Sequence, residues 1–109
     1  MIYEVITTEQ ADADLRGIYE YIAFELLSPD NAAGQLGRLE ERIAGLEKFP
    51  EKFRHYEKEL WHSRGLRVMP ADYYLVFYIP DKDAGIVTVI RVMHAGRDAD
   101  SWLKGHTVM

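Results

Sequence analysis

The spacing of apolar residues changes once along the chain, from three or four positions in the first half to two positions in the second half. A short β-favouring segment at residues 2–6 precedes a predicted helix over 7–27, and a second helix is predicted over 28–46. Thr7 and Gln10 have the spacing of a capping box, and Ser28-Pro29 is typical of a helix start. The predicted apolar faces are Ala11, Leu15, Ile18, Ile22 and Leu26, then Ala32, Leu36, Leu39, Ile43 and Leu46.

Strand-like segments follow from Arg64 onward, at residues 66–68, 73–79 and 86–92. The short junction at Ala71-Asp72 and the turn-rich link at 80–85 predict two β-hairpins, and the short link between the helices predicts a helical hairpin. The element order is β-α-α-β-β-β, with helices and strands grouped. We therefore expect one α+β domain over residues 1–109, a small and mainly antiparallel sheet with the helical hairpin packed on one face.

The formal charge of −5 is unevenly distributed. Residues 1–63 carry thirteen acidic and seven basic groups, whereas residues 64–109 carry five acidic and six basic groups. A net acidic chain is a poor general binder of nucleic acid, because phosphate neutralisation needs a surplus of cations. The segment 48–67 is nevertheless basic and rich in aromatic residues, so it is either a surface for nucleic acid or a target, or a solvated loop. Its cations are Lys48, Lys52, Arg54, Lys58, Arg64 and Arg67.

Several classes of site have no support in the composition. There is no cysteine, and the four histidines do not have the spacing of a zinc motif, so we expect neither a metal nor another cofactor. No apolar run approaches the ~18 residues that would span a bilayer, and the first residues do not resemble a signal peptide. We expect a cytoplasmic protein with no membrane partner.

The last predicted strand ends in a group of polar residues. Arg91 and His94 should lie on opposite faces of a regular strand, so Arg91 is expected to pair with a carboxylate or to reach for a partner. His94 and Arg97 are separated by Ala95-Gly96, where the chain can turn, so both side chains can project from the strand end. Such a pair can move protons and hold a phosphate. The alternative is a surface histidine and an arginine paired with Asp98 or Asp100.

Four motifs give the chain a family resemblance. They are Asp14-Leu15-x-x-Ile18-x-x-Tyr21-Ile22, Leu46-x-x-Phe49-Pro50, Tyr74-Leu75-Val76-Phe77-Tyr78 and Arg91-Val92-Met93-His94-x-Gly96-Arg97-Asp98. In this order and spacing, over roughly residues 2–100, they resemble the RelE/ParE family of toxins from type II toxin-antitoxin modules. The resemblance implies a small sheet with a helical hairpin, and an antitoxin that folds along the toxin and silences it.

The same resemblance implies two possible targets. RelE-like members cut mRNA on the ribosome, and ParE-like members poison DNA gyrase through a protein contact. Tyr74 stands where nuclease members commonly have an arginine, which favours the gyrase target slightly, as does the acidic net charge. If the chain is RelE-like, the expected catalytic residues are Arg97 and His94, with Arg67 or Arg64 as a substitute cation. The expected contacts to nucleic acid or target are Lys48, Lys52, Arg54, Lys58, Arg64 and Arg91.

Overall fold

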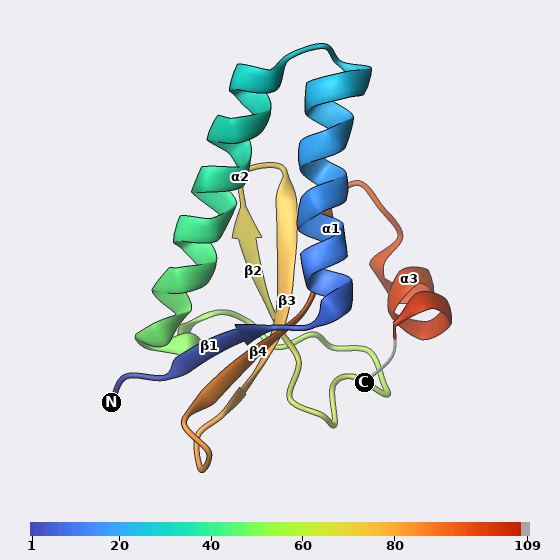
Figure 1. The fold of residues 1–109 in the computed structure, drawn as a ribbon. Helices are drawn as coiled ribbons and strands as arrows, with labels where there is room; N and C mark the ends of the chain where they lie inside the picture. Colours follow the sequence, from blue (N-terminus) through green and yellow to red (C-terminus); the bar gives the residue numbers. More distant parts are fainter. Residues whose placement is uncertain (108–109) are drawn as a thin grey trace.

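The computed structural model describes residues 1–107. Two helices lie side by side in front of a four-stranded sheet, and a third helix lies beside the sheet near the C-terminus (Figure 1). No helix in the described part of the chain is long and apolar enough to cross a membrane. The elements are β1 (Glu4–Thr7), α1 (Glu9–Glu20), a π-helical turn (Tyr21–Glu25), α2 (Pro29–Ala44), two short 3₁₀ turns (Gly45–Glu47 and Pro50–Lys52), β2 (Arg67–Ala71), β3 (Tyr74–Asp81), β4 (Ile86–His94) and α3 (Ala99–His106).

The sheet has the strand order β1-β4-β3-β2. β1 pairs with β4 in parallel, whereas β2, β3 and β4 form an antiparallel meander. The parallel pairing is possible because α1, α2 and two further strands separate β1 from β4 along the chain. The predicted α+β class, the mainly antiparallel sheet and the helical hairpin on one face are confirmed.

The helical hairpin packs on one face of the sheet through the predicted apolar stripes. Leu39, Ile43 and Leu46 are buried there against strand residues such as Val76 and Val89. The N-cap of α1 is Thr8 rather than the predicted Thr7, because the Thr8 Oγ1 accepts from the N–H of Ala11 and also donates to the carbonyl oxygen of Ile90. The cap therefore also fixes the start of α1 to β4.

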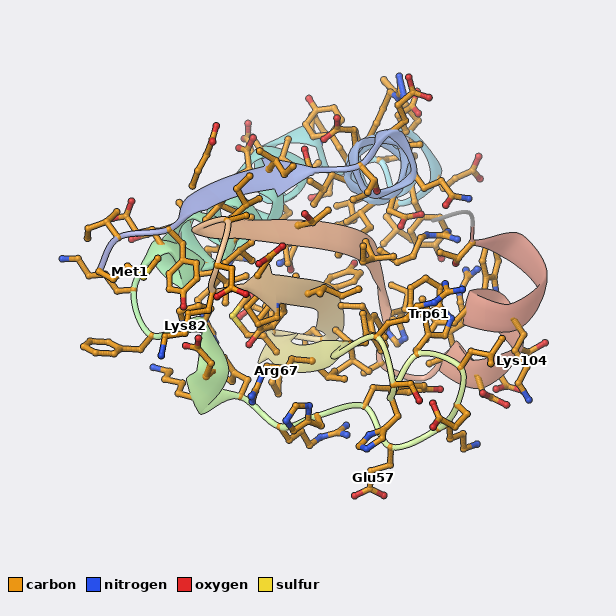
Figure 2. All side chains as sticks on the ribbon, turned by 90° about the horizontal axis from the view of Figure 1, so that it is seen from below. Met1, Glu57, Trp61, Arg67, Lys82 and Lys104 are labelled. Carbon is orange, nitrogen blue, oxygen red and sulfur yellow. The ribbon has the colours of Figure 1, made fainter. Side chains whose placement is uncertain are left out.

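The second face of the sheet is covered by elements that the sequence did not predict. Figure 2 shows the sheet between the helical hairpin above and the irregular segment 53–66 below, with Trp61 turned toward α3. The indole N–H of Trp61 donates to the carbonyl oxygen of Leu103 at 3.4 Å. The apolar residues of this second core are Tyr56, Trp61, Leu66, Val68, Phe77, Ile90, Met93 and Leu103.

A β-bulge interrupts the alternation of β4. Phe77 pairs with Arg91, whereas the next residue, Tyr78, pairs with Val89, so Ile90 is the extra residue. Before the bulge, Val89 faces the helical hairpin, and after it Val92 does. The bulge shifts the face of every later side chain in β4 by one position.

The tip of the helical hairpin departs from a regular helix. At Tyr21–Glu25 the helix widens to a π turn, and the N–H of Leu26 bonds the carbonyl of Tyr21. Leu26, predicted on the buried stripe, is 56% exposed, because the wider turn moves the buried position to Ala23. Leu27 then takes a left-handed conformation with φ of 54°, in the position where helices usually place glycine.

We expect the substitution Leu27→Gly to stabilise the fold. Replacing leucine by glycine removes roughly 1–2 kcal/mol of strain from the left-handed conformation of the folded state. Glycine also gives the unfolded chain more conformational entropy, which costs less than this gain, so the free energy of unfolding should rise by about 0.5–1 kcal/mol. Urea unfolding followed by circular dichroism measures this. The control Leu26→Gly, at a right-handed position, should lower the free energy of unfolding by a similar amount. A loss of stability in Leu27→Gly would contradict the strain at this residue.

Candidate functional site

A hollow of about 770 Å³ opens at the end of β4, between α1 and α3. Arg91 and His94 both line this hollow. The bulge precedes both residues and the pairing from Arg91 to His94 is regular, so they still start on opposite faces of β4 and reach the hollow from the two sides of the strand end. Arg97 joins them from the turn after the strand. The lining residues are Ala13, Asp14, Gly17, Ile18, Tyr21, Tyr74, Arg91, Val92, Met93, His94, Gly96, Arg97 and Trp102.

A buried ion pair lies at the base of the hollow. Asp14 of α1 accepts from the Arg91 Nε at 2.7 Å and from Nη2 at 2.8 Å, and its Oδ2 also accepts from the backbone N–H of Val92. Arg91 is only 5% exposed. The fork of two parallel bonds fixes the arginine, as expected for a charge that is removed from water. The expectation that Arg91 pairs with a carboxylate is thus met by Asp14.

Arg91 also connects to the C-terminal helix. Its Nη1 donates to the Thr107 hydroxyl at 3.2 Å, and its guanidinium lies 5.0 Å from the centre of the Trp102 ring. The guanidinium of Arg97 lies 4.2 Å from the same ring. Asp98 accepts from the Ser101 N–H and caps α3, and Asp100 lies near Lys58 and Lys104. The exposed Arg97 thus has an aromatic neighbour rather than the acidic one considered from the sequence.

The His94 ring is held by the turn that follows it. Its Nδ1 accepts from the backbone N–H of Gly96 at 3.0 Å, and its ring meets the edge of Tyr74. A side chain at position 96 would come within 3.3 Å of Nδ1, so glycine allows this close approach. A neutral histidine that accepts at Nδ1 carries its hydrogen at Nε2. The exposed nitrogen of His94 is then a donor and not a proton acceptor.

Tyr74 faces the hollow as an uncharged group. Burial raises the pKa of its hydroxyl above the usual range, and the neighbouring Tyr21 hydroxyl and Asp72 carboxylate add to this effect. Tyr74 is therefore a neutral phenol at physiological pH. It offers a hydrogen bond but no positive charge.

Arg67 is not part of this hollow. It pairs with Tyr78 in the sheet, whereas His94 pairs with Tyr74, four residues or about 13 Å away along β3. One Arg67 Nη donates to the carbonyl oxygens of Glu51 and Phe53 at 2.7 and 2.6 Å. Because paired residues share a face of the sheet, Arg67 lies on the same face as Tyr78, which packs under the helical hairpin, but away from the hollow. The structure thus brings together two of the three residues considered as catalytic.

The other cations of the basic segment lie outside the hollow as well. Lys52 lies over the ring of Phe53, Arg64 lies over the ring of Trp61, and Lys58 is 4.0 Å from Asp100. Five cations of the basic segment are exposed, and all five lie between α2 and β2: Lys48, Lys52, Arg54, Lys58 and Arg64. Within residues 1–107, apart from the side chain of His106, no group of three or more histidine or acidic side chains could hold a metal ion.

A second depression runs along β1, between α1 and α2, with a volume of about 650 Å³. Apolar side chains such as Val5 and Ile43 line it, and its acidic members are Glu4, Asp12, Glu40 and Glu47. The N–H groups of Glu4 and Thr8 donate to the carbonyl oxygens of Gly85 and Val89, so they point toward β4. By alternation, those of Val5 and Thr7 point away from β4, toward the open side of the sheet.

The other edge of the sheet, along β2, is covered. The N–H of Val68 bonds the carbonyl of Arg54, and the N–H of Tyr56 bonds the carbonyl of Leu66. Pro70 has no N–H, and its carbonyl accepts from Arg42. β1 is thus the edge of the sheet that is open to an added strand.

Comparison with known families decides what kind of protein carries these features. Residues 5–99 match the family model described as the ParE toxin of the type II toxin-antitoxin system parDE. The chain belongs to the ParE toxin family. In this ParE-family toxin the match ends where α3 begins, so Trp102 lies outside it.

Solved structures share the fold of the toxin at low sequence identity. A chain of the chromosomal ParDE system from P. aeruginosa superposes with a TM-score of 0.70 at 17% identity, covering 85% of this chain and 96% of that one. The RelBE2 complex from Mycobacterium tuberculosis gives 0.62 at 22% identity, with 86% and 92% covered. A mutant of the free E. coli toxin RelE gives 0.61 at 16% identity, with 91% and 90% covered. A search of the curated proteins found no match.

Sequence reasoning missed three residues of the hollow. Asp14 appeared only as part of a family motif, although an aspartate next to the apolar stripe of a helix is a signal for a buried ion pair. Trp102 was missed because no helix was predicted there, yet Asp98 followed by Trp102-Leu103 has the pattern of a capped amphipathic helix. Tyr21 also appeared only in that motif, although it follows Asp14 by seven residues and Ile18 by three, which is the spacing of one helical face.

We expect Asp14→Asn to destabilise the toxin strongly. The substitution keeps the shape of the side chain but leaves the buried Arg91 without its counter-charge, which costs about 3–5 kcal/mol in comparable sites. Thermal and urea unfolding measure the loss. Lys104→Ala serves as the control, because it removes an exposed i,i+4 pair with Asp100 and should cost less than about 0.5 kcal/mol. Equal effects of the two substitutions would refute the structural role of the buried pair.

Proposed function

We propose that the toxin acts by binding and poisoning DNA gyrase, and that it does not cut RNA. The observation that carries this proposal is the state of the polar groups in the hollow. Arg91 is neutralised by Asp14, the exposed nitrogen of His94 is a donor, and Tyr74 is uncharged. A surface of this kind suits recognition of a protein better than proton transfer.

Cleavage of RNA by its own 2′-hydroxyl has requirements that this hollow meets poorly. A base must accept the hydroxyl proton, and fixed cations must stabilise the charge that develops on the phosphate. His94 would have to give up its bond from the Gly96 N–H or present its other tautomer to act as the base. Arg97 is the only exposed arginine among the lining residues, and Arg67 lies elsewhere on the sheet.

The charge of the whole molecule supports the same conclusion. A toxin that enters the ribosome meets a surface of RNA phosphates, which a net charge of −5 opposes. None of the exposed cations of residues 48–64 lies among the residues that line the hollow. They are proposed to contact the target protein.

The toxin is further proposed to be silenced by a cognate antitoxin that adds a strand to β1. The N–H groups of Val5 and Thr7 offer donors for a new strand, while β2 is covered by residues 54–56. The groove beside β1 is apolar at its base and acidic at Glu4, Asp12 and Glu40. An antitoxin segment that combines apolar and basic side chains would complement it.

A RelE-like mRNA endonuclease is the second candidate. It is favoured by one observation, the shared location of His94 and Arg97 on one hollow at the end of β4. In that case His94 is the base and Arg97 stabilises the scissile phosphate.

His94→Gln and Arg97→Ala separate the two candidates. If the toxin poisons gyrase, the concentration of His94→Gln toxin that half-inhibits supercoiling should lie within about threefold of the wild-type value, because no proton transfer is lost. If it cleaves mRNA, the same change should lower the cleavage rate by about 10²–10⁴-fold, and Arg97→Ala should also abolish cleavage. Inhibition of purified gyrase and mapping of mRNA 5′ ends after induced expression are the two measurements. Codon-specific mRNA ends that vanish in His94→Gln would overturn the proposal.

Thr7→Pro tests the antitoxin edge. Proline removes the outward N–H of Thr7 and is tolerated on an edge strand, so the toxin should fold but bind the antitoxin encoded beside its gene at least tenfold more weakly. Thr7→Val is the matched control, because it keeps the N–H and loses only the hydroxyl bond to Asp12. Calorimetric titration measures both affinities. Equal binding of the two variants would exclude strand addition at β1.

A further inference from the structure

The tip of the helical hairpin gathers exposed apolar side chains. Ten large hydrophobic residues are exposed in the described structure, and four of them lie within the seven residues 21–27, so they form a cluster rather than a scatter. The four are Tyr21, Phe24, Leu26 and Leu27, of which Phe24 is 67% and Leu27 is 82% exposed. We define residues 21–27 as the hairpin tip.

The backbone of the hairpin tip is strained where it presents these side chains. The π turn at Tyr21–Glu25 is a rare geometry that occurs often at functional sites. Leu27 has a φ of 54°, although glycine would take this conformation without cost. The most exposed leucine of the toxin thus has a backbone conformation that is unfavourable for any residue with a side chain. Strain of this kind is retained where the side chain has a use that outweighs the lost stability.

The hairpin tip is also well placed for contact. Figure 1 shows the loop between α1 and α2 standing clear of the sheet, at the end of the hairpin away from β1. The 12 residues of α1 separate it from β1 by about 18 Å. Tyr21 belongs both to the hairpin tip and to the lining of the hollow, so the two surfaces are continuous.

The charges around the hairpin tip decide what it can bind. Residues 17–37 contain Glu20, Glu25 and Asp30 and no lysine or arginine. Carboxylates beside apolar anchors oppose both an anionic membrane and a nucleic acid. They complement a protein groove that is apolar at its base and basic at its rim, where large side chains act as anchors and the rim charges set orientation.

We infer that the hairpin tip is a docking surface for the target protein. Its apolar side chains insert into an apolar groove of that protein, and lysine or arginine side chains line the rim of the groove. This inference rests on the proposed function, in which the target is a protein. It assigns the main apolar anchors to the hairpin tip and leaves to the hollow a polar contact beside them.

The test compares the hairpin tip with equally exposed residues elsewhere. Phe24→Ser and Leu27→Gly remove anchors from the tip, whereas Ile2→Ser removes a residue of similar exposure from the start of the chain, outside the tip and the basic segment. The readouts are growth arrest on induced expression, melting temperature, and binding of the purified toxin to purified gyrase. We expect both tip variants to lose growth arrest and at least tenfold in affinity. Ile2→Ser should behave as the wild type, and Leu27→Gly should melt no lower than the wild type.

Charge reversal provides a second readout. The double variant Glu25→Lys/Asp30→Lys should bind gyrase more weakly than Glu25→Gln/Asp30→Asn, and the difference should shrink as salt is raised. Equal binding of the two double variants at low salt would contradict a basic rim.

Three other outcomes would overturn the inference. Tip variants that arrest growth like the wild type would remove the hairpin tip from the target contact. Loss of antitoxin binding with growth arrest retained would make the antitoxin the occupant. A wild-type dimer that Phe24→Ser converts to a monomer, with growth arrest retained, would make a second copy the occupant. By contrast, a wild-type toxin that arrests growth but does not bind gyrase would contradict only the proposed function. The effect of the tip variants on growth arrest would still test the hairpin tip.

Discussion

The buried pair of Asp14 and Arg91 is the interaction on which the arrangement of the candidate site depends. The carboxylate of Asp14 binds both the arginine and the backbone N–H of Val92, so it fixes α1 to β4 just after the bulge. The same arginine contacts Thr107 and Trp102 and so holds α3 beside the strand. Because one side chain joins three elements, the hollow at the end of β4 has a defined shape rather than a variable one.

The same interaction explains why the hollow is poor in available charge. Arg91 is a conspicuous cation in the sequence, yet its charge is balanced by Asp14, and Tyr74 adds none. His94 has one nitrogen engaged by Gly96, and Arg97 stacks beside Trp102. What remains is an aromatic surface with a few fixed donors. Such a surface is typical of protein interfaces, in which tyrosine, tryptophan and arginine are enriched.

Periodicity in the sequence predicted the element order, the helical hairpin and its buried faces, because Leu39, Ile43 and the alternating valines report local geometry directly. It missed features that depend on distant contacts. The cap falls on Thr8 instead of Thr7 because only Thr8 reaches the carbonyl of Ile90. The bulge at Ile90 and the left-handed Leu27 carry no glycine to mark them. The short helix α3 depends on its packing against Trp61 rather than on a long apolar stripe.

In the proposed function, this member of the ParE family works by contact, with its apolar anchors at one end of the helical hairpin and its antitoxin edge at the other. The most direct test is the supercoiling of relaxed plasmid by purified DNA gyrase in the presence of the purified toxin, beside translating ribosomes given the same toxin and a defined mRNA. Inhibited supercoiling with intact mRNA is the predicted result. Cleaved mRNA with unaffected supercoiling would contradict the account.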